Sequence, residues 1–95
     1  MHVYLIEYDL NRPGQNYPEL IEAIKGLGAW CHHLKSAWLV VSSGSAVQVR
    51  AALLPHIDET DDLMVMKVDG EAAWYGLSDE ISNWITERLQ GAARV

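Results

Sequence analysis

The stretch VYLIEYDL, residues 3–10, decides the fold of this chain. Its β-branched, aromatic and aliphatic residues follow one another almost without interruption, which predicts a central β-strand covered on both faces. The run ends in one carboxylate, Asp9, and Glu7 lies on the same face because side chains alternate along a strand. We therefore expect a buried strand in the middle of a sheet, with an acid at its end.

Turn and cap signals divide the next sixty residues into short elements. Pro13 and Gly14 indicate a turn, and Pro18 suits the first turn of a helix. Ser45 and Gln48 form the pattern of a capping box, and Pro55 stops the helix that follows. The expected elements are a turn at residues 11–14, a helix at 17–27, strands at 29–34 and 37–41 joined by a tight hairpin, a helix from Ser45 to Pro55, and a strand at 63–68.

The resulting order is β-α-β-β-α-β, which is the split βαβ arrangement. It predicts an α+β ferredoxin-like sandwich, with two helices on one face of a four-stranded antiparallel sheet. A third helix is expected at about residues 78–90, entered from Ser78 or Asp79 and left at Gly91. Its apolar positions are Ile81, Trp84, Ile85 and Leu89. This helix can cover the other face of the sheet or fasten two subunits together.

Length and composition predict one domain over residues 1–95, with the ferredoxin-like core in about residues 1–69. A domain this small has a marginal core, so an oligomer would stabilise it. Four Trp and four Tyr supply rings of the kind enriched at interfaces. These features favour a homodimer.

Charge and cysteine content narrow the partners and the compartment. The formal net charge of −6, with seven scattered Lys and Arg, disfavours nucleic acid as a partner. Cys31 is the only cysteine, so we expect a reducing compartment and a small buried hydrophobe at that position. Neither a secretory signal nor a membrane-length apolar segment is found in the sequence, which predicts a cytoplasmic protein that does not associate with a membrane.

Asp9 has two interpretations. In the simpler one it caps or braces the following turn through Asn11 and Arg12. In the other, a symmetric dimer brings two copies of Asp9 together, where their oxygens can hold Mg²⁺. No cofactor is certain from these residues, and Mg²⁺ is expected only if the chain is a nuclease.

Other chemical candidates have simpler interpretations. The adjacent His32 and His33 point to opposite faces of a strand and cannot chelate one ion. The acidic run at residues 58–62 lacks the glycine and glutamate of a calcium loop, so we interpret it as a solvated turn. Trp74 and Tyr75 can stack on a nucleobase, but without basic neighbours they more simply pack at an interface.

The triplet Tyr8-Asp9-Leu10, the hairpin around Ser36 and the element order resemble the CRISPR-associated protein 2 family over about the first two thirds of the chain. The resemblance implies a ferredoxin-like homodimer in which the aspartate matching Asp9 approaches its symmetry mate and holds Mg²⁺ for phosphodiester cleavage. It also implies a second role as a structural dimer that assembles with an integrase. The virulence-associated D toxin ribonucleases are similar in fold.

The run from Tyr8 to Pro18 and the segment at residues 70–76 resemble more closely a group of short bacterial and phage proteins labelled SinR-like. That group brings no settled activity, and a helix-turn-helix is absent here. Two departures weigh against a nuclease: the acidic balance, and a carboxy-terminal helix where the CRISPR family has a strand that swaps onto its partner. Only Asp9 carries over as a catalytic and metal-binding candidate, and Ser36 as a turn residue.

The sequence therefore favours a homodimeric binding or assembly module in a prokaryotic or phage system, with a possible protein partner. The first alternative is a Mg²⁺-dependent endoribonuclease that uses Asp9 from both subunits. The second is a small nucleotide-binding module that uses the groove around Trp74 and Tyr75.

Overall fold

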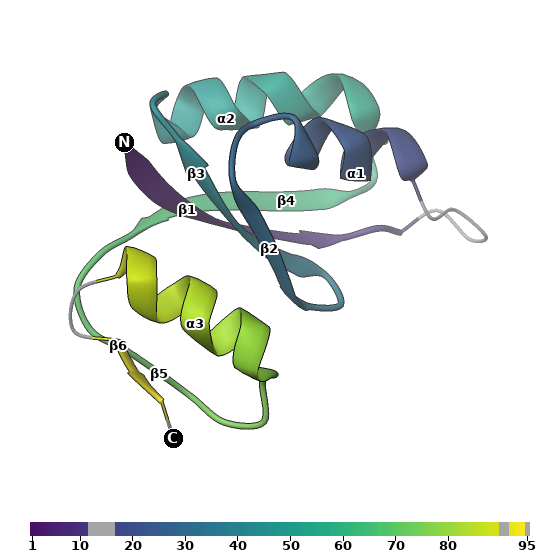
Figure 1. Ribbon diagram of the computed structural model, residues 1–95. Coiled ribbons are helices and arrows are strands. Elements are labelled where there is room, and N and C mark those ends of the chain that lie inside the picture. The colour runs from purple at the N-terminus through teal and green to yellow at the C-terminus, as the bar shows by residue number, and fades with distance from the viewer. Residues whose placement is uncertain (12–16, 90–91, 95) are drawn as a thin grey trace.

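The computed structural model describes residues 1–11, 17–89 and 92–94, as a four-stranded sheet between two layers (Figure 1). The elements, in chain order, are β1 (His2–Asp9), α1 (Pro18–Lys25), β2 (Trp30–Leu34), β3 (Ala37–Ser42), α2 (Ala46–Leu53), the 3-10 turn η1 (Leu54–His56), β4 (Asp62–Val68), β5 (Ala72–Trp74), α3 (Asp79–Arg88) and β6 (Ala92–Arg94).

The main sheet has the strand order β2-β3-β1-β4, and every neighbouring pair in it is antiparallel. The predicted central position of the first strand is confirmed, since β1 pairs with β3 on one side and β4 on the other. Ile6 shows the register, because it lies opposite Trp38 of β3 and Val65 of β4. The expected α+β class with a four-stranded antiparallel sheet is therefore correct.

The helices begin where the sequence indicates. Pro18 occupies the first turn of α1, after Tyr17 with a positive φ of 48°. At α2 the Ser45 hydroxyl accepts from the Gln48 N–H at 3.2 Å, and the Gln48 side chain accepts from the Ser45 N–H at 2.8 Å, which confirms the capping box. The Ser78 hydroxyl caps α3. In the described ranges no helix combines the length and the apolar character needed to cross a bilayer.

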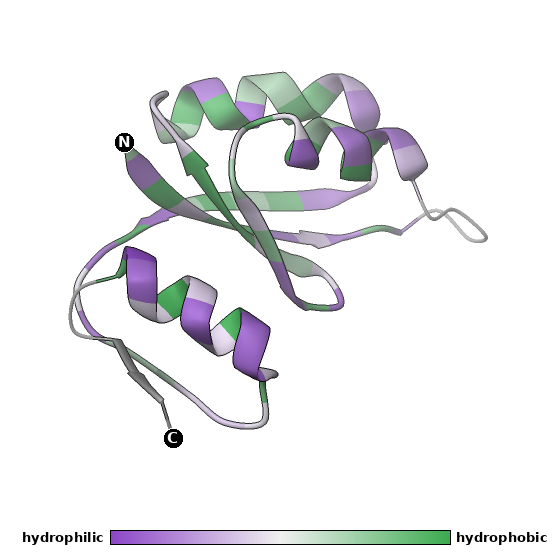
Figure 2. Ribbon diagram, viewed as in Figure 1, coloured by the Kyte–Doolittle hydropathy of each residue, from purple (hydrophilic) through white to green (hydrophobic). Residues whose placement is uncertain are grey.

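The two faces of the sheet are covered differently. Helices α1 and α2 lie over one face, where Tyr4, Ile6, Trp38 and Val40 are almost fully buried. Helix α3 and the β5–β6 ribbon lie on the opposite face, against a smaller cluster that includes Val3 and Ile85. Figure 2 shows hydrophobic residues along the strands between these layers and hydrophilic residues at their margins. We call the face under α1 and α2 the helix-covered face, and the face that carries α3 and the β5–β6 ribbon the open face.

Some expected boundaries differ from the structure. Helix α1 is shorter than the range 17–27 at both ends. Tyr17 is left-handed and precedes the helix, and after Lys25 the chain keeps right-handed geometry only at the cap, Gly26, before Gly28 takes a φ of 155°. The parallel pair β5 and β6 was not expected, since each strand has three residues and contains two alanines, which have low strand propensity. The expected turn at Pro13 and Gly14 and the helix exit at Gly91 lie outside the described residues.

Candidate functional site

Asp9 lies exposed at the end of the central strand β1. The register pairs it directly with Asp62 of β4, and on the same face it pairs Glu7 with Met64. These four residues and Ser36 line a groove of about 380 Å³ on the open face. Like charges directly opposite one another on neighbouring strands are destabilising. The Asp9 end of the sheet therefore has a local negative potential, which a bound cation would offset.

Asn11, rather than Asp9, braces the end of β1. Its backbone N–H donates to Asp61 Oδ1 at 2.8 Å, and its side-chain amide donates to the Thr60 carbonyl at 2.7 Å. The same amide donates to Asp62 Oδ2 at 3.3 Å, and the Tyr17 hydroxyl donates to Asp61 Oδ1 at 3.2 Å. These bonds tie the end of β1 and the start of α1 to the loop that precedes β4. The acidic run at residues 58–62 is thus a hydrogen-bonded turn.

The Asp9 carboxylate forms no hydrogen bond or ion pair with any residue in the ranges 1–11, 17–89 and 92–94. Arg12, the partner expected in the simpler interpretation, lies outside those ranges. Among the described residues, no group of three or more His, Cys, Asp or Glu side chains is arranged to hold a metal ion. One chain therefore offers two opposed carboxylates, Asp9 and Asp62, as oxygen ligands.

The adjacent histidines diverge, as strand alternation predicts. The His32 ring stacks on Trp38 with centroids 3.8 Å apart and planes 7° apart, and its Nε2 lies 3.1 Å from the Lys35 carbonyl. His33 lies on the open face with Leu39. A register shift between Cys31 and Leu34 interrupts the pairing of β2 at this point. The two imidazoles therefore serve different surfaces.

His33 is the titratable group whose surroundings favour a neutral ring. Burial lowers the pKa of His33, and the nearby His32 lowers it further, while the backbone of Cys31 and the charge of Glu7 oppose the change. Its Nδ1 atom is buried and has no hydrogen-bond partner in the part of the chain that the structure describes. The Cys31 backbone is thus near enough to favour a proton on the ring, yet it does not meet the geometry of a hydrogen bond.

Cys31 is a free, buried thiol, as the sequence predicts. Burial raises its pKa, while Arg88 lowers it and Glu80 raises it. The protonated thiol is therefore favoured at neutral pH, and Cys31 packs as a small apolar side chain beside Leu39 and Ile85.

A second cavity was missed by the sequence analysis. It has a volume of about 590 Å³ and lies between the open face and the β5–α3 segment. Its walls are residues from four separate parts of the chain: Leu5, His33, Leu34, Leu39, Lys67, Val68, Asp69, Glu71, Ala72, Ala73, Trp74, Tyr75, Leu77, Ile85 and Leu89. The sequence features that could have indicated this cavity are the apolar stripe of α3 and the aromatic pair Trp74 and Tyr75 that precedes the helix.

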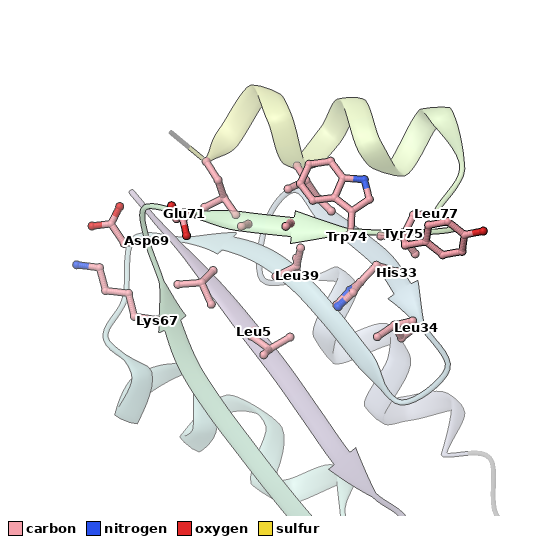
Figure 3. A pocket seen from close by; sticks show the side chains of 15 residues that line it. Leu5, His33, Leu34, Leu39, Lys67, Asp69, Glu71, Trp74, Tyr75 and Leu77 are labelled. Carbon is pink, nitrogen blue, oxygen red and sulfur yellow. The ribbon is translucent and has the colours of Figure 1, made fainter. Parts of the chain in front are cut away.

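The aromatic pair at residues 74–75 is divided between two environments. The Trp74 indole N–H donates to Ser82 Oγ at 2.9 Å, and Ser82 is 1% exposed, so this bond holds β5 against α3. Tyr75 is 87% exposed at the margin of the cavity. Figure 3 shows the indole over the cavity and the Tyr75 ring directed away from it. Packing therefore explains Trp74 but not Tyr75.

Comparison with known proteins gives no relative from which a function can be transferred. No family model, no curated protein and no solved structure matches the chain. The resemblance to the CRISPR-associated protein 2 family therefore stays a hypothesis that depends on the sequence motifs themselves.

Proposed function

We propose that this chain is a homodimeric binding or assembly module with the ferredoxin-like fold of the CRISPR-associated protein 2 family. Two observations support that fold. The strand order β2-β3-β1-β4 is the order of a split βαβ sheet, and α1 and α2 share one of its faces. A compartment that keeps Cys31 reduced, such as the cytoplasm, agrees with this proposal.

One observation carries the proposed assembly role: exposed apolar side chains gather on the open face. Leu34 is 57% exposed, Met64 is 47% exposed and Met66 is 48% exposed. Leu34 and Met64 line the same groove, and Met66 lies opposite Leu5, whose side chain faces the neighbouring cavity. Isolated apolar residues are common on protein surfaces, whereas a contiguous set marks an interaction site. We call Leu34, Met64 and Met66 the apolar patch.

A second copy of the chain is the partner that this patch fits best. A two-fold axis through the open face places the same apolar side chains on both sides of the interface. Methionine adapts to irregular surfaces, and dimerisation adds buried area to a small domain. Nucleic acid is a poorer fit, because Glu7, Asp9 and Asp62 adjoin the patch and would repel phosphates.

Sedimentation velocity over a range of protein concentrations tests this role. We expect the unmodified chain to form a dimer and Met64→Lys to remain monomeric, since two buried lysines would face each other across the axis. The matched control is Val47→Lys, which changes a 61% exposed valine on α2 and should leave the dimer intact. A monomeric unmodified chain at all concentrations, or a Met64→Lys variant that dimerises normally, would contradict the proposal.

The second candidate function is a Mg²⁺-dependent endoribonuclease, which the pairing of Asp9 with Asp62 favours. Opposed carboxylates are the ligands that Mg²⁺ prefers, and a bound ion would offset their repulsion and activate water. The Asp9 carboxylates of both subunits would hold the metal ion, which would supply an activated water.

RNA cleavage in the presence of Mg²⁺ separates the two functions. If the chain is a nuclease, Asp9→Asn abolishes cleavage, while the control Asp69→Asn, which changes another exposed acid, does not. Absence of cleavage by a chain that dimerises through the apolar patch leaves the assembly module as the function. The small nucleotide-binding alternative has less support, because Asp69 and Glu71 lie at the cavity beside Trp74 and would repel phosphates.

A further inference from the structure

The cavity between the open face and the β5–α3 segment has the size of a small-molecule site. Its volume of about 590 Å³ lies within the range of about 300–1,000 Å³ typical of such sites. The cavity shares Leu34 with the apolar patch, so a ligand site here would adjoin the surface proposed for assembly.

The middle of the cavity is apolar. Leu5 and Leu39 supply the floor from the sheet, and Trp74 forms an aromatic wall that the hydrogen bond to Ser82 fixes in place. Leu77, Ile85 and Leu89 complete the wall on the side of α3. Apolar walls in contact with water are unfavourable, so an apolar body that displaces the water would be stabilised. A flat ring fits best beside an indole, because aromatic rings stack.

Charged residues lie at one end of the cavity. Figure 3 shows Lys67, Asp69 and Glu71 together where β4 leads into β5. None of the three side chains forms an ion pair or a hydrogen bond within the described ranges of the chain. Two acids and one base leave an excess of negative charge there, and the whole chain carries a net charge of −6. This end of the cavity therefore favours a cation and disfavours an anion.

His33 lies away from that charged end, beside Leu39 and Leu34 (Figure 3). Its surroundings favour the neutral ring, which has one nitrogen that accepts a hydrogen bond. No side chain in the described ranges pairs with the ring through a hydrogen bond. Because Nδ1 is buried, an N–H group on a ligand would bond to the other ring nitrogen, Nε2, and a neutral imidazole does not repel a cationic ligand.

We propose that this cavity binds a small aromatic amine. The ring lies between Trp74 and Leu39, the ammonium group lies at the end formed by Asp69 and Glu71, and a donor on the ring system bonds to His33. No covalent step is involved. The contacts at the acidic end, the contact with His33 and the apolar walls must act together, since none of them alone would hold a ligand of this size.

Three commercial probes that share one ring test the proposal: tryptamine, indole and indole-3-acetate. We expect amide and indole resonances of the cavity walls to shift in ¹⁵N NMR spectra as tryptamine is added, with saturation. Tryptamine should bind at least about fivefold more tightly than indole-3-acetate. The two probes share the indole ring, but tryptamine carries a positive charge that Asp69 and Glu71 attract, while indole-3-acetate carries a negative charge that they repel. Equal or tighter binding of indole-3-acetate would overturn the proposal, and so would the absence of wall shifts with all three probes.

Variants test the two polar ends separately. Glu71→Gln changes an exposed side chain and should weaken tryptamine about two- to fivefold, whereas the remote control Glu59→Gln should not. His33→Leu should weaken tryptamine and indole alike by about three- to tenfold, while His32→Leu, on the opposite face, leaves both unchanged. Tryptamine binding that is indifferent to Glu71→Gln and His33→Leu would contradict the assignment. The same titration on Met64→Lys shows whether binding persists without the dimer, as the proposal requires.

Discussion

The two faces of the sheet differ in how completely they are covered. On the helix-covered face, Ile6 and Val40 are 0% exposed, and the Trp38 indole donates to the Tyr8 hydroxyl at 3.0 Å inside the core. On the open face, the same strand carries Leu5 beside a cavity, and β4 carries the half-exposed Met64. The first face is built for stability. The second leaves apolar surface exposed, and exposed apolar surface is available to bind a partner or a ligand.

The largest expected effect comes from truncating neighbouring residues of β1. Ile6→Ala should reduce the free energy of unfolding by about 2–5 kcal/mol, because it leaves a closed void among packed side chains. Leu5→Ala should reduce it by only about 1–2 kcal/mol, because Leu5 borders a cavity and is already partly exposed. Urea unfolding followed by tryptophan fluorescence measures both. Equal losses would mean that the two faces contribute alike to stability.

A smaller effect is expected where α3 is attached to the open face. Ser82→Ala leaves the partly buried Trp74 indole N–H without its acceptor, which should cost about 0.5–1.5 kcal/mol. Hydrogen exchange should become faster in α3 and stay unchanged in α1 and α2, since the bond holds only the outer layer. Ser43→Ala, at an exposed position, is the control. Faster exchange throughout the molecule would contradict a locally attached layer.

The acidic end of β1 should respond in the opposite direction. Asp9→Asn removes the repulsion with Asp62 and should raise the free energy of unfolding by about 0.2–1 kcal/mol. Thermal unfolding with and without Mg²⁺ extends the comparison. If the paired acids hold the ion, Mg²⁺ raises the unfolding temperature of the unmodified chain only. A loss of stability in Asp9→Asn would instead indicate that Asp9 braces its turn.

The smallest expected effect is the pH dependence due to His33. Its pKa is lowered in the folded chain, so the unfolded chain binds more protons below about pH 6.5. Folding stability should therefore fall as the pH decreases from 7 towards 5. His33→Leu should remove part of this slope, as seen in urea unfolding at several pH values, while His32→Leu should remove less. An unchanged slope in His33→Leu would mean that other groups govern the acid response.

The parts of the fold that sequence could predict are those with strong local signals. The central strand β1, the hairpin at Lys35 and Ser36 and the capping box at Ser45 were each determined by a few neighbouring residues. The strands β5 and β6 could not be predicted, because three residues with two alanines gain strand structure only from pairing with each other across about twenty residues of chain.

The candidate sites divide in the same way. Alternation along β1 correctly placed Asp9 and Glu7 on one face, but the opposition of Asp9 and Asp62 required the register with β4. The roles of Asn11 and of the cavity beside His33 depend on contacts between distant segments, which no local pattern specifies. Whether Asp9 meets its symmetry mate remains a prediction.

Methionine oxidation in the intact chain tests the central claim most directly, because one molecule carries both the probe and its control. Met64 and Met66 lie in the apolar patch, while Met1 is 91% exposed at the amino terminus. We measure the peroxide oxidation rate of each methionine by peptide mass spectrometry at increasing protein concentration. The account predicts that Met64 and Met66 become protected as dimers form while Met1 does not. Constant rates at Met64 and Met66 in a sample that sediments as a dimer would contradict it.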